Sequence, residues 1–475
     1  MIAFAFFVVH PKPTAGPIFR DFESYYAAGA TWRYETDPYG RDVWRVEKDI
    51  PGVVRTRDEL LPFVGPPFGL PLWSAFSRLP WEGAVALWGT LLALSIGVIA
   101  FGSLRLAGGA SGALDVFATL VVVAGFGPLT SGVALGQVAV VATAAIVLAP
   151  LVLGPRLTVA AFACALAAAL QPNLALALAA RVGSKRSWIA FVSAALVALG
   201  GSALALGGPD GFAHYLAVLR EHGDAERFIA IQTTPAAVAR ALGASAALAS
   251  ACGIAVALVA FVLVALQCTR GRYAPNARLG LACAALPLAL PFAHEHDFTI
   301  AFLPAILVVR AARGTTWLTG VCAALLVGTD WLGLAQRPDG IAATALLTFA
   351  AALGFAALAR GPLRPYHVAP AAFALIVAGT GAIVAAHSLP TWPDGLGANF
   401  HVPATLPAPV VWRLEQVRSG ITALDPAWGA LRLASLTGCA LLWFAASLAL
   451  AAPAAARRER YARGPAGTVR IGASR

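Results

Sequence analysis

The sequence is poor in charged residues. Asp, Glu, Lys and Arg make up 12% of its 475 residues, whereas 59% are hydrophobic. Soluble domains carry about 25% charged residues, and a soluble fold of this length could not bury so much apolar surface. The hydrophobic residues form blocks of about 15–25, long enough to cross a hydrocarbon core of roughly 30 Å. The composition therefore excludes a soluble globular protein and predicts an all-α polytopic membrane protein.

Several familiar motifs are also missing. The sequence has no Walker A, GxSxG or dinucleotide-binding fingerprint, and its cysteines show no CxxC or zinc-site spacing. All six cysteines fall within or at the ends of hydrophobic segments, so no structural disulfide is expected. The net charge of +11 is spread over short loops, unlike the clustered basic face of a nucleic-acid-binding protein. No nucleic-acid partner is therefore predicted.

Hydrophobicity predicts a bundle of about 11–13 transmembrane helices. The predicted segments are residues 84–104, 114–127, 137–153, 157–170, 188–207, 246–267, 279–292, 298–310, 315–334, 340–359, 366–387 and 432–452. A short piece at 173–182 follows Gln171-Pro172, where the proline predicts a helix break that turns the chain back. Met1 to Val9 are too few to span the bilayer, and we interpret them as the remnant of a truncated first helix.

Basic residues predict the orientation of this bundle. If successive segments cross the membrane in alternate directions, one face holds Arg105, Arg156, Arg181, Lys185, Arg186, Arg270, Arg272, Arg278, Arg310, Arg313, Arg360, Arg364 and the tail from Arg457. Glu459 is the only clear acid expected on that face. The opposite face holds nearly every other acid, including Asp21, Glu23, Asp37, Asp58, Glu221, Asp224, Glu295 and Asp297. The positive-inside rule makes the basic face cytoplasmic. We expect a multi-pass protein of the inner (plasma) membrane whose active site faces the periplasm or exterior.

Three long loops fall on the acidic face, at residues 10–83, 208–245 and 388–431. The first places aromatic residues beside apolar ones, which predicts short helices lying in the membrane interface. Loops of this length are usually functional. We assign residues 1–455 to one transmembrane domain in contact with membrane lipids, and residues 456–475 to a basic cytoplasmic tail that is predicted to be disordered.

The first loop and a later turn carry the candidate catalytic groups. Asp21, in the run Arg20-Asp21-Phe22-Glu23, is either a general base at the membrane interface or an ordinary solvated acid. The tract His294-Glu295-His296-Asp297 lies between two apolar spans, where ionisable side chains are costly and indicate function. It is a hydrogen-bonding or proton-transfer site, a Zn²⁺ site or a solvated turn.

Two glutamines lie at expected helix ends on the same face. Gln137 follows Gly136 at the start of a predicted spanning helix. Its side chain either caps that helix or binds a polar ligand. Gln171 lies at the predicted helix break. The backbone N–H and C=O groups freed there either line a binding cavity or form hydrogen bonds with neighbouring helices.

Taken in order, these features resemble the polyprenyl-phosphate-mannose-dependent mannosyltransferases of glycosyltransferase family 87, which have the GT-C fold. The resemblance covers about residues 18–310. It rests on Asp21 with Tyr25-Tyr26-Ala27-Ala28-Gly29, Asp37-Pro38-Tyr39, Phe63-Val64-Gly65-Pro66-Pro67, Gly136-Gln137, Gln171-Pro172 and the 294–297 tract. It implies a GT-C-like bundle and an inverting, cofactor-free transfer of a hexose, normally mannose. The donor is a polyprenyl-phosphate sugar, and the acceptor is a glycolipid or glycan.

The resemblance also implies residue roles. Asp21 maps onto the family's general base, and His294 or His296 maps onto its catalytic histidine. Expected substrate-binding residues are Arg20, Tyr25, Tyr26, Gln137, Gln171, Glu295 and Asp297. Gln171 stands where the family commonly has lysine, which leaves Arg20, Arg33 or Arg240 to supply positive charge to the donor phosphate.

Two other functions remain as alternatives, a membrane transporter or flippase and a non-catalytic scaffold. Transporters often show internal repeats and buried midplane charges, and neither is clear in this sequence. The long acidic first loop argues against a scaffold. The sequence therefore favours a lipid-linked sugar transferase.

Overall fold

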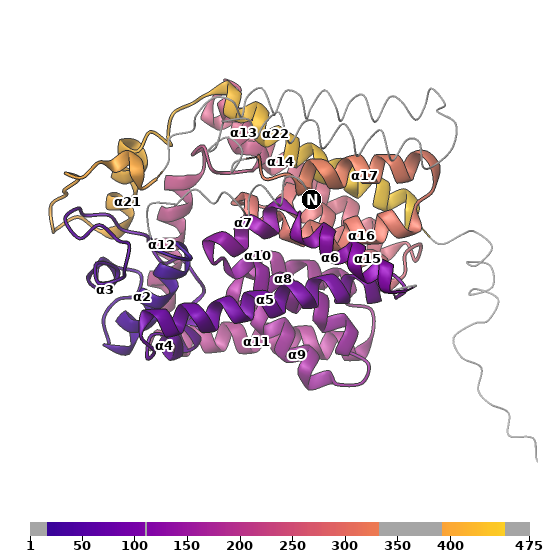
Figure 1. The fold of residues 1–475 in the computed structure, drawn as a ribbon, viewed down its shortest axis with the longest axis horizontal. Coiled ribbons are helices and arrows are strands. Elements are labelled where there is room, and N and C mark those ends of the chain that lie inside the picture. The colour runs from indigo at the N-terminus through magenta and orange to yellow at the C-terminus, as the bar shows by residue number, and fades with distance from the viewer. Residues whose placement is uncertain (1–16, 110–111, 332–391, 452–475) are drawn as a thin grey trace, which may run out of the picture.

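The computed structural model describes residues 17–109, 112–331 and 392–451, and these are helical with no strand among them. Figure 1 shows long helices running side by side, with short helices gathered at one end. Four described helices are long and apolar enough to cross a membrane: α5 (Trp81–Leu106), α11 (Lys185–Ala205), α14 (Ala246–Thr269) and α22 (Pro426–Ala449). The predicted all-α polytopic membrane fold is confirmed. The segments at 340–359 and 366–387, the start of the 388–431 loop, the N-terminal stub and the tail lie outside the described residues.

Shorter helices complete the bundle. They are α6 (Ala113–Ala124), α7 (Gly127–Leu135), α8 (Val138–Val152), α9 (Leu157–Leu170), α10 (Pro172–Ala175), η2 (Leu176–Arg181), α15 (Pro275–Ala289), η3 (Glu295–Ala301), α16 (Phe302–Ala311) and α17 (Gly314–Gly328). The predicted break is confirmed, because Gln171 interrupts the helix between α9 and α10 with φ −147°. Leu178 and Arg181 line the same pocket as Pro150 and Leu153. The chain therefore returns after the break to the end where α9 begins.

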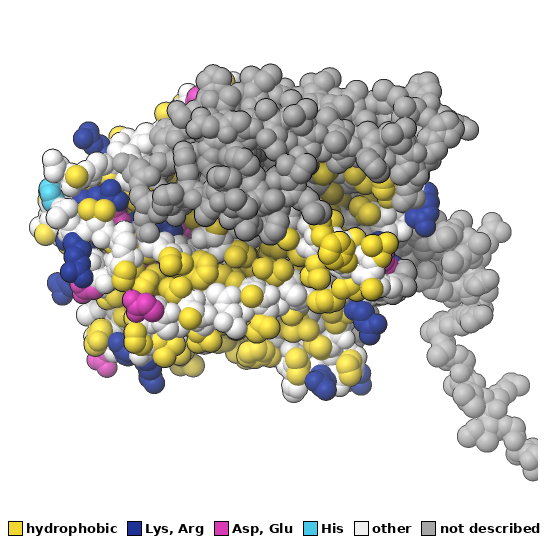
Figure 2. All heavy atoms as spheres, viewed as in Figure 1, with side chains coloured by type: hydrophobic (Ala, Val, Ile, Leu, Met, Phe, Trp, Pro, Cys, Tyr) yellow, Lys and Arg dark blue, Asp and Glu magenta, His cyan; other side chains and the backbone are white. Residues whose placement is uncertain are grey.

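The long helices present apolar side chains to their surroundings. In α11 and α14, only 17% and 11% of the most apolar window is buried. Leu204 and Phe261 are 81% and 72% exposed. Figure 2 shows hydrophobic side chains over the middle of the visible face and Lys and Arg side chains at its two ends. A contiguous apolar surface of this kind fits contact with lipid tails.

The three long loops fold into short helices that contact one another. These helices are α2 (Phe22–Arg33), α3 (Val43–Glu47), η1 (Pro67–Gly69), α4 (Leu70–Phe76), α12 (Pro209–Glu226), α13 (Pro235–Ala241), η4 (Asp394–Leu396) and α21 (Ala408–Arg418). The Asp58 backbone N–H donates to the Phe400 carbonyl at 2.8 Å, and the Ala230 N–H donates to the Ile421 carbonyl at 2.8 Å. Three loops distant in sequence thus form one layer, at the left end of the bundle in Figure 1.

One detail of the predicted charge segregation is wrong. Asp115, in the first turn of α6, lies 3.0 Å from the Arg310 guanidinium, so the basic face holds an acid besides Glu459. The placement has a physical reason, since a carboxylate in the first turn is stabilised by the helix dipole as well as by its ion pair.

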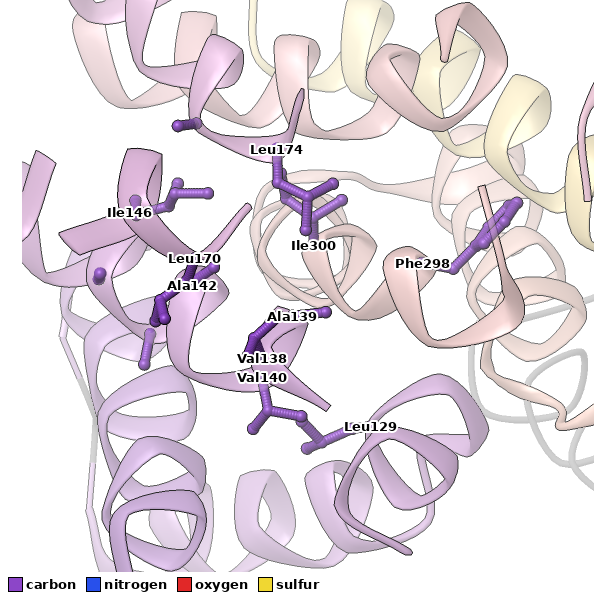
Figure 3. Close-up of a cluster of buried hydrophobic side chains, with 14 of the residues drawn as sticks. Leu129, Val138, Ala139, Val140, Ala142, Ile146, Leu170, Leu174, Phe298 and Ile300 are labelled. Carbon is purple, nitrogen blue, oxygen red and sulfur yellow. The ribbon is translucent and has the colours of Figure 1, made fainter. Parts of the chain in front are cut away.

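A hydrophobic cluster fixes the ends of several helices relative to one another. Figure 3 shows Leu129 of α7, Val138 and Val140 of α8, Leu170 of α9 and Ile300 of η3 among its side chains. These residues are at most 4% exposed. Because the cluster lies next to Gln137, Gln171 and the 294–297 tract in the chain, its packing brings those polar residues to one region.

Candidate active site

Asp21 is held against the junction of α7 and α8. Its backbone N–H donates to the Leu135 carbonyl at 2.9 Å, and the Gln137 side-chain amide donates to its carboxylate. Gly136 makes this contact feasible, because it adopts φ +75° and a Cβ there would lie 2.4 Å from the Cβ of Phe19. The predicted motifs at Asp21 and at Gly136-Gln137 therefore form one structural unit.

The environment of Asp21 favours proton transfer. The side chain is half-buried, and burial raises the pKa of its carboxyl group. The Gln137 hydrogen bond and the charges of His294 and Arg20 oppose that rise without cancelling it. A carboxylate with a raised pKa is a stronger base than a solvated one and still accepts a proton near neutral pH.

His294 is held between two acceptors. Its Nε2 is 3.5 Å from Oε2 of Glu226, and its Nδ1 is 3.2 Å from the Ile231 carbonyl oxygen. Burial alone would lower the pKa of His294, but the hydrogen bond and charge of Glu226 outweigh it and raise the pKa to about 9. His294 is therefore a cation at neutral pH, and its charge acts on Asp21.

His296 and Asp297 connect this region to the helix break. Asp297 accepts from the Gln171 side-chain amide at 3.3 Å and from the His294 backbone N–H at 2.9 Å. His296 lies beside Gly132, where a Cβ would be 3.5 Å from the Cβ of His296 and 3.9 Å from that of Gln137. Gln137, Gln171 and the 294–297 tract thus meet at one place.

The two predicted tyrosines diverge. The Tyr25 ring centroid lies 4.8 Å from that of Trp73, and burial together with the charges of Asp21 and Asp297 raises the pKa of the Tyr25 hydroxyl. Tyr26 instead donates to the Leu79 carbonyl at 2.9 Å and packs on Trp81. Only Tyr25 of the pair joins the assembled group.

Arg20 and Glu295 point to other partners. Arg20 is 8% exposed, and its guanidinium lies 2.6 Å from Glu59 and 3.3 Å from Glu23. Glu295 accepts from the Ser435 hydroxyl of α22 at 3.2 Å. Arg240 donates to the Ala244 carbonyl at 2.8 Å, and Arg33 donates to the Tyr34 hydroxyl at 3.2 Å. A substrate role for any of these four residues stays a prediction.

Sequence reasoning missed Glu226 and its partners. Glu226 is 3% exposed and contacts His222, Trp412 and Gln232 in addition to His294. A signal was present in the sequence, since His222 and Glu226 are four residues apart and so share a helix face. The contact of Glu226 with His294 spans 68 residues and has no local sequence signature.

The arrangement combines a base with a fixed positive charge. Asp21 can accept a proton, while His294 offers charge to an anion that forms nearby. Within the described ranges, no group of three or more His, Cys, Asp or Glu side chains is placed to hold a metal ion. The pairing of Asp21 with His294 is suited to acid–base chemistry.

Comparison with known proteins gives one match. Residues 63–292 match the family model described as Glycosyltransferase family 87. The matched range contains Gln137, Gln171 and Glu226, and the predicted catalytic residues lie on either side of it. No curated protein and no solved structure matches the chain. The family match supports a membrane glycosyltransferase.

Proposed function

From this match to glycosyltransferase family 87, we propose that the chain moves a hexose, specifically mannose, from a polyprenyl-phosphate carrier to an acceptor hydroxyl. The acceptor is a glycolipid or glycan, and the transfer inverts the anomeric carbon. The reaction takes place at the periplasmic or outer face of the inner membrane. The observation that carries the proposal is the half-buried Asp21 carboxylate, hydrogen-bonded by Gln137 and facing the charge of His294.

The chemical step follows from these positions. The acceptor hydroxyl loses its proton to Asp21, and its oxygen attacks the anomeric carbon from the face opposite the phosphate. The bond from that carbon to the phosphate oxygen breaks, and its electron pair stays on the phosphate. The products are the glycosylated acceptor, polyprenyl phosphate and a protonated Asp21.

The developing negative charge explains the need for a cation. The departing phosphate gains charge in the transition state, and a preorganised positive group lowers the barrier only if it stabilises that state more than the bound donor. We assign this role to His294, whose charge already acts on the proposed base. His296, Gln137, Gln171 and Tyr25 then shape the sugar subsite.

A complementation experiment tests the proposal. In a strain lacking the gene, mass spectrometry of extracted lipids and glycans should show a missing mannosylated species that the wild-type gene restores. Asp21→Asn should restore about 100-fold less of it, because a general base is lost. Asp49→Asn is the matched control, since Asp49 lies in the same loop with its side chain 81% exposed. Full restoration by Asp21→Asn would remove Asp21 from the mechanism.

A further inference from the structure

A buried cluster adjoins the proposed site but has no role in the chemical step. At its centre, both oxygens of the Glu226 carboxylate are occupied. Oε1 lies 3.1 Å from Nε2 of His222 and accepts from the Trp412 indole at 2.6 Å. Oε2 accepts from the Gln232 amide at 3.3 Å and lies 3.5 Å from Nε2 of His294. Two hydrogen-bond donors and two histidine rings thus surround this one carboxylate, and of the four only His222 belongs to the same helix.

The His294 ring has acceptors at both of its nitrogens. One faces Glu226, and the other faces the Ile231 carbonyl at 3.2 Å. A neutral imidazole carries only one N–H, whereas the protonated ring carries two and satisfies both acceptors. The edge of the ring packs on Phe292 at 4.8 Å. This geometry fits a fixed, positively charged imidazole.

Building on the proposed function, we propose that Glu226 is the positioning residue for His294. Its carboxylate fixes the ring and maintains the positive charge that faces Asp21 and the departing phosphate. Glu226 does not touch the reacting atoms and acts only through His294.

The third long loop takes part in this positioning. Trp412 of α21 donates to Glu226 and stacks on His222, with ring centroids 6.3 Å apart and an interplanar angle of 10°. The contact therefore joins α12 and α21 at the same carboxylate. Removal of the Trp412 indole should weaken the hold on Glu226 while leaving its charge in place.

The electrostatic balance predicts what happens without Glu226. Burial disfavours a charged His294, and Glu226 is the largest influence acting against burial. The remaining charged or titratable groups around the ring are Asp297, Asp21, His296 and His222, with Arg432 donating to the nearby Ile229 and Gln232 carbonyls. Of these groups, only the carboxylates favour the charged ring. In Glu226→Gln, the pKa of His294 should therefore fall.

The test compares pH–rate profiles of the full-length protein in liposomes, with polyprenyl-phosphate-mannose as donor. Activity that needs a protonated His294 declines as pH rises through the pKa of that group. This decline forms the alkaline limb of the profile. In Glu226→Gln, the alkaline limb should shift to lower pH by about 1–3 units, the usual effect of losing one close opposite charge. Glu226→Asp should restore part of the shift. The matched control is Glu221→Gln, an exposed acid on the same helix, which should keep the wild-type limb.

A second readout does not depend on catalysis. Diethyl pyrocarbonate acylates the neutral form of a histidine ring and not the protonated form, so the pH dependence of His294 labelling, followed by peptide mass spectrometry, reports its pKa directly. Labelling of Glu226→Gln should begin at lower pH than labelling of the wild type, with Trp412→Phe in between. If Glu226→Gln does not fold, Trp412→Phe carries the test alone. Unchanged labelling and an unchanged alkaline limb would overturn the positioning role. If labelling shifts as expected but the wild-type protein transfers no sugar, the positioning role of Glu226 stands and the proposed function is overturned.

Discussion

At the scale of single residues, the account depends on how Asp21 is held. Gln137 donates to its carboxylate and partly opposes the rise in pKa that burial causes. The proposed base acts only when deprotonated, so activity should rise with pH through the pKa of Asp21. The limb on the acid side of the profile therefore reports this side chain, and the alkaline limb reports His294.

Replacing Gln137 should shift the acid limb. In Gln137→Leu, the hydrogen bond is lost, the pKa of Asp21 rises further, and the acid limb moves to higher pH by roughly one unit. Initial rates of mannose transfer across the acid range measure the shift. Gln267→Leu is the control, because Gln267 donates to Ser447 far from the site along the bundle. An acid limb that stays in place would show that Gln137 does not act on the base.

The sequence identified some of these residues better than others. Asp21 and the 294–297 tract stand out because acids and histidines are rare next to apolar spans. A substrate role for Arg20 stays a prediction, and its guanidinium lies against Glu23 and Glu59. The Glu59 contact crosses 39 residues of loop, and no periodicity predicts such a pairing. Glu226 escaped notice for the same physical reason.

At the scale of helices, hydrophobic length predicted positions well. The segment expected at 157–170 coincides with α9, and the break at Gln171 was predicted from the proline that follows it. The helix at 114–127 was only partly predicted, because α6 ends at Ala124 and a 61° bend leads into α7. Hydropathy does not register such a bend, since both pieces are apolar. That bend leads to Gly136 and the contact with Asp21.

Gly136 provides a test at this scale. A Cβ at Gly136 would clash with Phe19, and its φ of +75° disfavours any side chain. Gly136→Ala should destabilise the protein by about 1–3 kcal/mol and lower transfer activity by displacing Asp21. Thermal unfolding in detergent and transfer rates measure the two effects. Gly97→Ala in α5 should be neutral in both, because no atom lies within 4 Å of that position. Equal behaviour of the two variants would contradict the role of this close approach.

At the scale of the whole molecule, the outer loops form a layer over one end of the bundle. The short basic loops lie at the other end, where Asp115 pairs with Arg310. From the positive-inside rule we propose that this layer lies outside the cytoplasm. Sequence predicted the lengths of the loops but not their mutual contacts, such as Asp58 with Phe400, because those depend on the packed bundle.

Site-directed labelling tests the orientation. Asp49→Cys, in the first outer loop, should react with a membrane-impermeant maleimide added to intact spheroplasts. Arg156→Cys, between α8 and α9, should react only after the membrane is opened, because it lies on the basic face. Both positions are exposed, and the unsubstituted chain supplies the background from its six free cysteines. The opposite pattern would put the proposed site in the cytoplasm.

The most direct measurement of the central claim is single-turnover transfer by purified protein at saturating polyprenyl-phosphate-mannose, with donor affinity measured in parallel. If Asp21 is the general base, Asp21→Asn should bind the donor as tightly as the wild type and transfer its sugar about 100-fold more slowly. Equal single-turnover rates in the two proteins would contradict the account.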